Sequence, residues 1–335
     1  MTENLKDRRA RLDETVARDS PLQMLRTTVR SAGADYGILV LFVSLVVLGR
    51  IVYEGFFTKA NLESILSQSA PLGIVAIGMT FVIIAGGFDL SVGATFAIGA
   101  TLFASLGNTH SWLWSGTITV VVGLGLGLVN AVVVTLLKVN PFIATLGTSS
   151  IYGGGVLLLT NNNAYVLGRF GALGADSVAG IPISIIVLVV LFIIGWIVLR
   201  MTVWGRGVYA VGGNDEASHL AGLRVAVVRG STYVLSGGLA AFAGIMQASR
   251  LGSGQGNIGA TMALNAIAVV VIGGTALLGG EGAMWRTGIG LLIIGILSNV
   301  FFSLALSANW QTVVTGVILI LAVAFDVLIR TGRRK

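Results

Sequence analysis

The sequence predicts an all-α fold, a polytopic transmembrane helical bundle of about ten helices with the N- and C-termini in the cytoplasm. The first observation is composition: 55% of the 335 residues are hydrophobic and only 10% are charged, with a mean hydropathy of +0.92. One water-soluble core cannot bury so many apolar side chains, so the remainder must face lipid. The second observation is that apolar stretches of roughly 17 to 25 residues, long enough to cross the hydrocarbon layer, recur along the chain. Because backbone groups in lipid must pair within their own segment, stretches of this length favour helices over a barrel.

The apolar spans can be drawn in order along the chain. Their predicted bounds are 37–56, 70–86, 91–107, 113–137, 142–159, 181–200, 229–249, 263–279, 286–305 and 310–329. The second and third are short, and an alternative is that they form a re-entrant hairpin, which leaves about eight full spans. The 47 glycines against 4 prolines fit helices that approach closely through small residues.

The sequence therefore divides into a cytoplasmic N-terminal tail (1–35), a transmembrane domain (36–330) with a polar loop at 201–228, and a short cytoplasmic C-terminal tail (331–335). Lys and Arg accumulate on the cytoplasmic side of membrane proteins. With the N-terminus inside, most of the 21 Lys and Arg residues fall on cytoplasmic segments. The exceptions, predicted outside, are Arg50, Lys59, Arg169 and Arg250.

Several kinds of site are excluded by what the sequence contains. It has no cysteine and only two histidines, so neither thiol chemistry nor a metal site is expected. It has no GxxxxGK[ST] motif, so the chain has no P-loop for ATP. Residues 254–259 match GxGxxG but lack a βαβ context, and are predicted to be an outer loop. The basic residues lie at the ends of apolar runs, which argues against a nucleic-acid partner despite the net charge of +7.

The first candidate site is the segment 86–93, where Gly86, Gly87, Asp89 and Ser91 interrupt two apolar spans. Transporters build solute sites at interrupted helices, because glycines expose backbone groups there and half-helix ends carry partial charges. The alternative is that Asp89 caps the following helix at the membrane surface. A second glycine group has the same spacing, which indicates either an ancient duplication or chance. The two groups are Gly86, Gly87 and Gly93, and Gly273, Gly274 and Gly280.

The second candidate site is a short helix in the 201–228 loop. Asn214 can cap its N-terminus, Asp215 and Glu216 complement the positive end of the helix dipole, and Gly222 can close its C-terminus. The helix is too polar to insert into the bilayer. It either lies on the lipid surface or docks a cytoplasmic partner.

Several motifs in chain order resemble the permeases of ribose-type and xylose-type ABC importers, from about residue 36 to the C-terminus. The motifs are GMTFVIIAGGFDLSVG (78–93), NPFIATLGT (140–148), GGNDEA (212–217), AIA with VIGGT (266–275), and Trp310-Gln311. One departure stands out: Ala263-Leu264-Asn265 replaces the Glu-Leu-Asp that is common in the family. This departure puts a shared sugar-contacting role of those acids in doubt.

The resemblance implies a non-enzymatic permease subunit that moves a monosaccharide, polyol or related small solute across the bacterial inner membrane by alternating access. It implies no cofactor in this chain, with ATP and Mg²⁺ held by a separate cytoplasmic ATPase. The other implied partners are an external solute-binding protein, a second permease copy or a homologous permease, and the lipid bilayer. Two alternatives stay open: a stand-alone secondary carrier or channel, and an ABC permease for a furanosyl signal molecule or a branched amino acid.

By the same resemblance, three groups of residues have expected roles. The residues expected to couple the permease to the ATPase are Asn214, Asp215, Glu216, Ala217 and Gly222. Those expected near the translocation pathway are Gly86, Gly87, Asp89, Ser91, Asn140, Asn265, Gly273 and Gly274. Arg250 and Gln255 are expected to contact the binding protein, although an Arg at a helix end also commonly extends its charge toward water.

Overall fold

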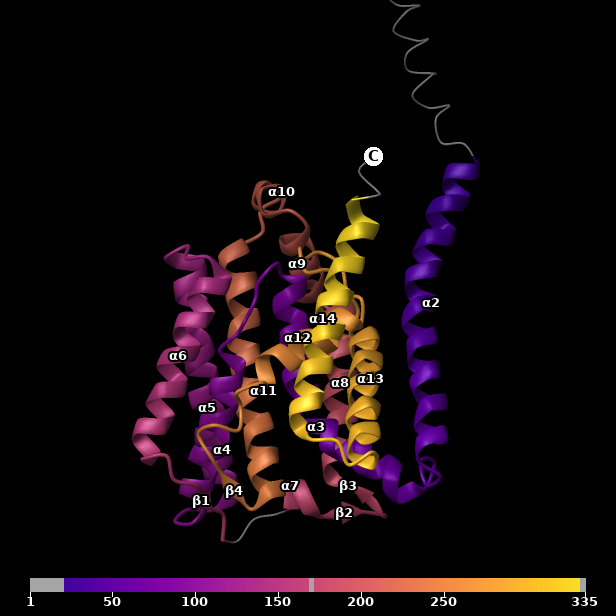
Figure 1. Cartoon of the computed structure of the whole chain (residues 1–335). Helices are drawn as coiled ribbons and strands as arrows, with labels where there is room; N and C mark the ends of the chain where they lie inside the picture. The colour runs from indigo at the N-terminus through magenta and orange to yellow at the C-terminus, as the bar shows by residue number, and fades with distance from the viewer. Residues whose placement is uncertain (1–20, 169–171, 332–335) are drawn as a thin grey trace, which may run out of the picture.

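The computed structural model of the protein describes residues 21–168 and 172–331, which form a bundle of helices (Figure 1). This confirms the predicted all-α class. Of the predicted tails and loops, residues 1–20, Arg169 and residues 332–335 lie outside the described part of the chain.

Each predicted span corresponds to one helix, although α12 has only 11 residues, and short helices and strands lie between the spans. The helices are α2 (Pro21–Val52), α3 (Lys59–Ile84), α4 (Val92–Gly107), α5 (Trp112–Ala131) continued by the π-helix η1 (Val132–Leu136), α6 (Pro141–Thr160), α7 (Ala172–Ala175), α8 (Ile183–Met201), α9 (Val203–Gly213), α10 (Asp215–Leu220), α11 (Val225–Leu251), α12 (Met262–Ile272), α13 (Met284–Ser303) and α14 (Ala308–Thr331). Two antiparallel pairs of two-residue strands complete the fold: β1 (Tyr165–Val166) with β4 (Ser253–Gly254), and β2 (Ser177–Val178) with β3 (Ile181–Pro182).

Three boundaries differ from the prediction. Helix α2 begins at Pro21, inside the predicted tail. Helix α3 begins at Lys59 rather than at residue 70, because Thr58 caps it by accepting a hydrogen bond from the Asn61 amide. Helix α12 ends at Ile272 rather than at residue 279, and the chain turns at Gly274, where φ is +78°. With 26 residues α3 is long enough to span a membrane by itself, whereas α4 has 16.

The two ends of the bundle differ in their contents. Figure 1 shows α10 and the end of α14 at one end, the α10 end, and β1 to β4 with α7 at the other, the strand end. The described chain begins at Pro21 in α2 and ends at Thr331 in α14, and both of these points lie on the same side as the 201–228 loop, as the charge distribution predicts. That distribution also predicts the α10 end to be cytoplasmic.

Burial separates central helices from peripheral ones. In the most apolar stretch of α3, 83% of the residues are buried, against 22% in both α6 and α8. Helix α11 packs against α3, α4 and α5 in the interior. Among the described residues, six helices are long and apolar enough to cross a membrane, and the peripheral ones expose large apolar side chains such as Leu158 and Leu159. The chain is a multi-pass membrane protein whose outer helices face lipid.

Candidate functional site

The bundle contains a break between α3 and α4, formed by residues 85–91. Helix α3 ends at Ile84, Gly86 turns the chain with a φ of +76°, and α4 starts after Ser91. Because only glycine adopts this φ without strain, the turn depends on the glycine that the sequence singled out. The break carries Asp89, which is 1% exposed.

Asp89 is enclosed by hydrogen-bond donors. Its Oδ1 accepts bonds from the Ser91 amide at 3.1 Å and the Ser91 hydroxyl at 2.6 Å, and its Oδ2 accepts one from the Ser236 hydroxyl at 3.0 Å. Ser91, not Asp89, stands at the N-cap position of α4, and its side chain makes no capping bond to a described residue. The alternative that Asp89 caps α4 at the membrane surface is therefore wrong, because the carboxylate is buried among three helices.

The network around Asp89 extends into α5 and α6. The Asn130 amide nitrogen lies 3.5 Å from Asp89 Oδ1 and donates to the Ser91 hydroxyl at 2.7 Å. Thr148 in turn donates to the Asn130 side-chain oxygen at 2.7 Å. Sequence reasoning missed Asn130, Thr148 and Ser236. The available signal was a lone amide, Asn130, in the otherwise apolar run of α5.

One face of α11 holds the break at three points. Arg229 Nε donates to the Ala85 carbonyl at 3.0 Å, the Tyr233 hydroxyl donates to the Phe88 carbonyl at 3.2 Å, and Ser236 binds Asp89. Spacings of four and three residues place side chains on one face of a helix. This α11 stripe (Arg229, Tyr233 and Ser236) therefore follows the break from the end of α3 to its carboxylate.

The short helix predicted in the polar loop is present as α10. The Asn214 side chain caps it by accepting from the Ala217 amide at 2.9 Å, and Gly222 follows its end with a φ of +85°. Glu216 and Ala217 are exposed, and the Leu220 side chain is 81% exposed. Helix α9, which precedes α10, was not predicted; the Thr202 hydroxyl caps it by accepting from the Gly205 amide at 2.9 Å. The fold thus presents α10 to solvent on a supporting helix.

A glycine junction joins α3, α9 and the loop after α12. The Gly280 amide donates to the Ile84 carbonyl at 2.8 Å, and a Cβ added at Gly212 would overlap that same carbonyl. A Cβ at Gly279 would press on the Gly86 backbone. The loops that contain the two predicted glycine groups therefore meet at this junction, although Gly273 packs instead against the Arg286 backbone.

Tyr209 of α9 reinforces this junction. Its hydroxyl donates to the Gly282 carbonyl at 2.8 Å. Burial raises the pKa of the Tyr209 phenol above its ordinary value of 10.0, although Arg286 and Arg200 act in the opposite direction. The hydroxyl therefore keeps the proton that it donates at neutral pH.

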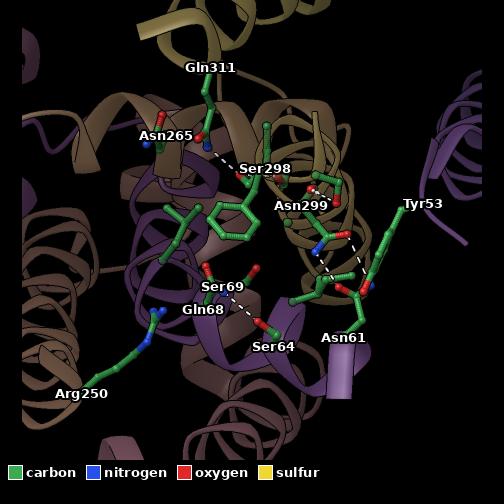
Figure 2. Close-up of a pocket in the computed structure, with 16 residues that line it drawn as sticks. Tyr53, Asn61, Ser64, Gln68, Ser69, Arg250, Asn265, Ser298, Asn299 and Gln311 are labelled. Atoms are coloured by element: carbon green, nitrogen blue, oxygen red, sulfur yellow. Dashed lines mark hydrogen bonds between the residues drawn. The ribbon is translucent and has the colours of Figure 1, made fainter. Parts of the chain in front are cut away.

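A separate cavity of about 540 Å³ lies between α3, α13 and α14 (Figure 2). It is lined by Tyr53, Asn61, Ser64, Ile65, Gln68, Ser69, Leu72, Arg250, Asn265, Ile294, Gly295, Ser298, Asn299, Phe302, Ser303 and Gln311. Most polar groups in this lining are neutral amides and hydroxyls. Arg250 is the one charged side chain among the described lining residues.

The amides of the cavity pair across helices. Asn299 Nδ2 donates to Asn61 Oδ1 at 2.8 Å, which joins α13 to α3. Gln68 donates to Ser64 at 2.7 Å, and Gln311 of α14 donates to Ser298 of α13. Figure 2 shows these three bonds around the cavity. Such side chains can hold hydroxyl groups in several orientations, because each amide offers both donors and an acceptor.

The structure distributes the predicted site residues over several places. Asn265 and Arg250 line the cavity. Gly86, Gly87, Asp89 and Ser91 belong to the break, while Gly273 and Gly274 end α12. Asn140 is exposed and caps α6 by accepting from the Phe142 amide at 3.0 Å, and Gln255 is exposed just after β4. The cavity residues Asn61, Gln68, Ser298 and Asn299 were not predicted.

The described residues also hold no group of three His, Cys, Asp or Glu side chains that could bind a metal ion.

Comparison with known proteins identifies the family. Residues 61–323 match the family model described as "Branched-chain amino acid transport system / permease component". The ribose import permease protein RbsC of Bacillus subtilis is 40% identical over 297 residues, which cover 85% of this chain and 90% of the relative. RbsC of Escherichia coli strain K12 is 36% identical over 295 residues, covering 86% and 92%. The fructose import permease protein FrcC of Rhizobium meliloti is 34% identical over 323 residues, covering 92% and 89%.

No solved structure matches the chain significantly. The family match covers most of the described bundle, including the break, α10 and every cavity-lining residue except Tyr53. Relatives of this kind are transport components of ABC systems that work with other subunits, and they are not themselves enzymes. The chain therefore belongs to the permease family of ABC importers.

Proposed function

We propose that the chain is the membrane-spanning permease of an importer that moves a monosaccharide or a similar polyhydroxylated solute across the bacterial inner membrane. ATP and Mg²⁺ act on a separate cytoplasmic ATPase, and an external binding protein delivers the solute. The observation that carries this proposal is the chemistry of the cavity, together with relatives named as ribose and fructose permeases.

The cavity suits a neutral solute with many hydroxyl groups. Its volume of about 540 Å³ lies within the roughly 300 to 1,000 Å³ of small-molecule sites. An amino acid carries an ammonium group, whose strongest partner inside a membrane is a carboxylate, and the described lining residues include no Asp or Glu. The cavity therefore favours a sugar over the branched amino acids in the family description.

The same amides also favour weak binding. Asn61 and Asn299 already bond to each other, so a solute must replace these bonds rather than satisfy free groups. An exchange of one hydrogen bond for another contributes little net free energy. A passage that holds its solute weakly releases it quickly, and we place most of the affinity in the external binding protein.

We assign the ATPase and the binding protein to opposite ends of the bundle. Helix α10, with exposed Glu216, Ala217 and Leu220, serves as the docking element for the ATPase at the α10 end. The binding protein docks at the strand end, where Gln255 is exposed and Arg250 lines the cavity. A second permease copy or a homologous permease completes the transport unit.

A stand-alone carrier is the rival that the structure favours less. Ion coupling needs paired or titrating charges along the passage. The groups that hydrogen-bond Asp89 are hydroxyls and amides of Ser91, Asn130 and Ser236, and the charged group described in the cavity is Arg250 alone. Dependence of uptake on ATP separates the two functions.

The first test is solute uptake into proteoliposomes that hold the chain with its ATPase and binding protein. Labelled ribose, fructose, arabinose, a polyol and leucine are compared with and without ATP. We expect ATP-dependent uptake of one sugar. We also expect at least about a tenfold loss in Asn299→Leu, roughly 1.4 kcal/mol, because leucine removes one amide from the passage and leaves Asn61 without its partner on α13. Ser150→Leu, on the exposed face of α6, is the matched control. Uptake of leucine alone, or uptake without ATP, would contradict the proposal.

The second test is docking of the ATPase. Glu216 is exposed and its charge makes no ion pair with a described residue, so Glu216→Arg changes the surface of α10 at the cost of one favourable interaction with the helix dipole, about 0.3 to 1 kcal/mol. We expect the amount of ATPase that copurifies in detergent to fall at least about tenfold, a loss of roughly 1.4 kcal/mol of binding. Glu54→Arg makes the same charge change toward the strand end and should retain the ATPase. Equal retention by both variants would show that α10 is not the docking element.

A further inference from the structure

Arg229 connects two parts of the molecule that the proposed function treats separately. Its Nη1 donates to Asp215 Oδ2 at 2.8 Å and its Nη2 to Asp215 Oδ1, while its Nε donates to the Ala85 carbonyl at 3.0 Å. Each of the three guanidinium nitrogens therefore donates a hydrogen bond. One planar group joins the first residue of α10 to the residue that ends α3.

The geometry requires arginine. A guanidinium presents its donors in a fixed fork that matches a carboxylate and still leaves Nε for a third acceptor. A lysine ammonium keeps the charge but is a point donor, and cannot hold both acceptors in one plane. The positive charge also lies at the C-terminus of α3, where the helix dipole favours it.

The arginine begins the α11 stripe. From Arg229 the stripe continues to Tyr233 at the Phe88 carbonyl and to Ser236 at the Asp89 carboxylate. Of these three side chains, Arg229 is the one that also reaches α10. Arg229 is therefore the side chain of the stripe that links α10 directly to the break, while Tyr233 and Ser236 attach the break to α11.

The exposure of the two partners fits this role. The Asp215 side chain is 52% exposed, whereas that of Arg229 is 19% exposed. Helix α10 has six residues, of which Ser218 alone is buried, so few of its side chains pack against the rest of the bundle. The Arg229 contact with Ala85 lies deeper, where less water competes for it.

We propose that Arg229 is the positioning residue that couples ATP-driven movement of α10 to the α3–α4 break. This inference rests on the proposed function, in which α10 docks the ATPase. Arg229 does not touch the ATPase or the solute in this arrangement. It holds α10 at a fixed distance from the break so that the two move together.

The experiment measures sugar transported per ATP hydrolysed in proteoliposomes that contain the complete complex. We expect Arg229→Lys and Arg229→Gln to copurify with the ATPase and to hydrolyse ATP, with at least a tenfold drop in sugar transported per ATP. Introducing Arg229→Lys into an Asp215→Asn background should add no further drop, because the two side chains act as one unit. Arg224→Gln, an exposed arginine at the start of the same helix, is the control and should keep the ratio of the wild type.

Other outcomes distinguish a failure of the role of Arg229 from a failure of the proposed importer function. A wild-type ratio in Arg229→Lys overturns the inference, and so does a drop that multiplies with that of Asp215→Asn. A purely structural role predicts a lower apparent Tm in detergent, with transport and ATP hydrolysis falling in proportion, which also overturns it. A wild-type complex that shows no ATP-dependent uptake overturns the proposed function instead, independently of any variant.

Discussion

Replacing Asp89 with alanine is expected to destabilise the bundle by about 3 kcal/mol or more and to abolish transport. The change leaves the Ser91 amide, the Ser91 hydroxyl and the Ser236 hydroxyl without their shared acceptor in a site that is 1% exposed. Each buried donor that loses its partner costs roughly 1 to 3 kcal/mol. The apparent midpoint of thermal unfolding in detergent measures the effect.

Two companion variants sharpen this prediction. Asp89→Asn keeps the shape and one acceptor oxygen, and the Ser236 hydroxyl can turn to accept, so we expect a smaller loss of stability. Asp176→Ala removes an exposed carboxylate and should leave the midpoint unchanged. An Asp89→Ala protein as stable as the wild type would show that these hydrogen bonds do not hold the break.

Replacing Gly212 with alanine is expected to disrupt the glycine junction, with a loss of transport and of stability. The added Cβ would overlap the Ile84 carbonyl and would lie 2.7 Å from the Gly280 amide nitrogen, so the backbone itself must shift. Overpacking of this kind costs about 1 to 3 kcal/mol. The unfolding midpoint and ATP-driven uptake are measured together.

The neighbouring glycine provides a matched control. A Cβ added at Gly213 meets no described atom within 4 Å, so Gly213→Ala makes the same chemical change one residue away without a clash. We expect this variant to behave as the wild type. Equal effects of the two substitutions would mean that the close approach of α9 to α3 is not required.

Hydropathy predicted the number and order of the main helices, because every segment that crosses lipid must be a continuous helix with enough apolar residues. The rule failed where helices leave the apolar region. The first part of α3, NLESILSQS after Lys59-Ala60, is too polar to count as membrane-spanning, yet it is helical because its polar side chains face the cavity and α13. At α12 an apolar run continues past Gly274, but the positive φ there ends the helix.

The site residues also fall into two groups: those with partners nearby in the sequence could be predicted, and those with distant partners could not. The α10 cap was predictable because Asn214 bonds to the amide of Ala217, three residues away. The Asn61–Asn299 pair joins residues 238 positions apart, and no local pattern in one sequence indicates such a pair. Asp89 stood out by its charge, but its partner Ser236 lies 147 positions away and is an ordinary serine in the sequence.

Helix α3 takes part in both the cavity and the break, so one continuous helix connects the two places. Its first half, through Leu72, lines the cavity. Its last residue, Ile84, enters the glycine junction about 38 Å from Lys59, the first residue, at 1.5 Å per residue. Pro71 lies within the helix and has no amide hydrogen to donate to the Ser67 carbonyl. Helix α3 therefore bends most easily at this residue. A movement of the junction end of α3 would therefore bend the helix at Pro71, next to the cavity-lining residues Ser69 and Leu72, and would change the width of the cavity there.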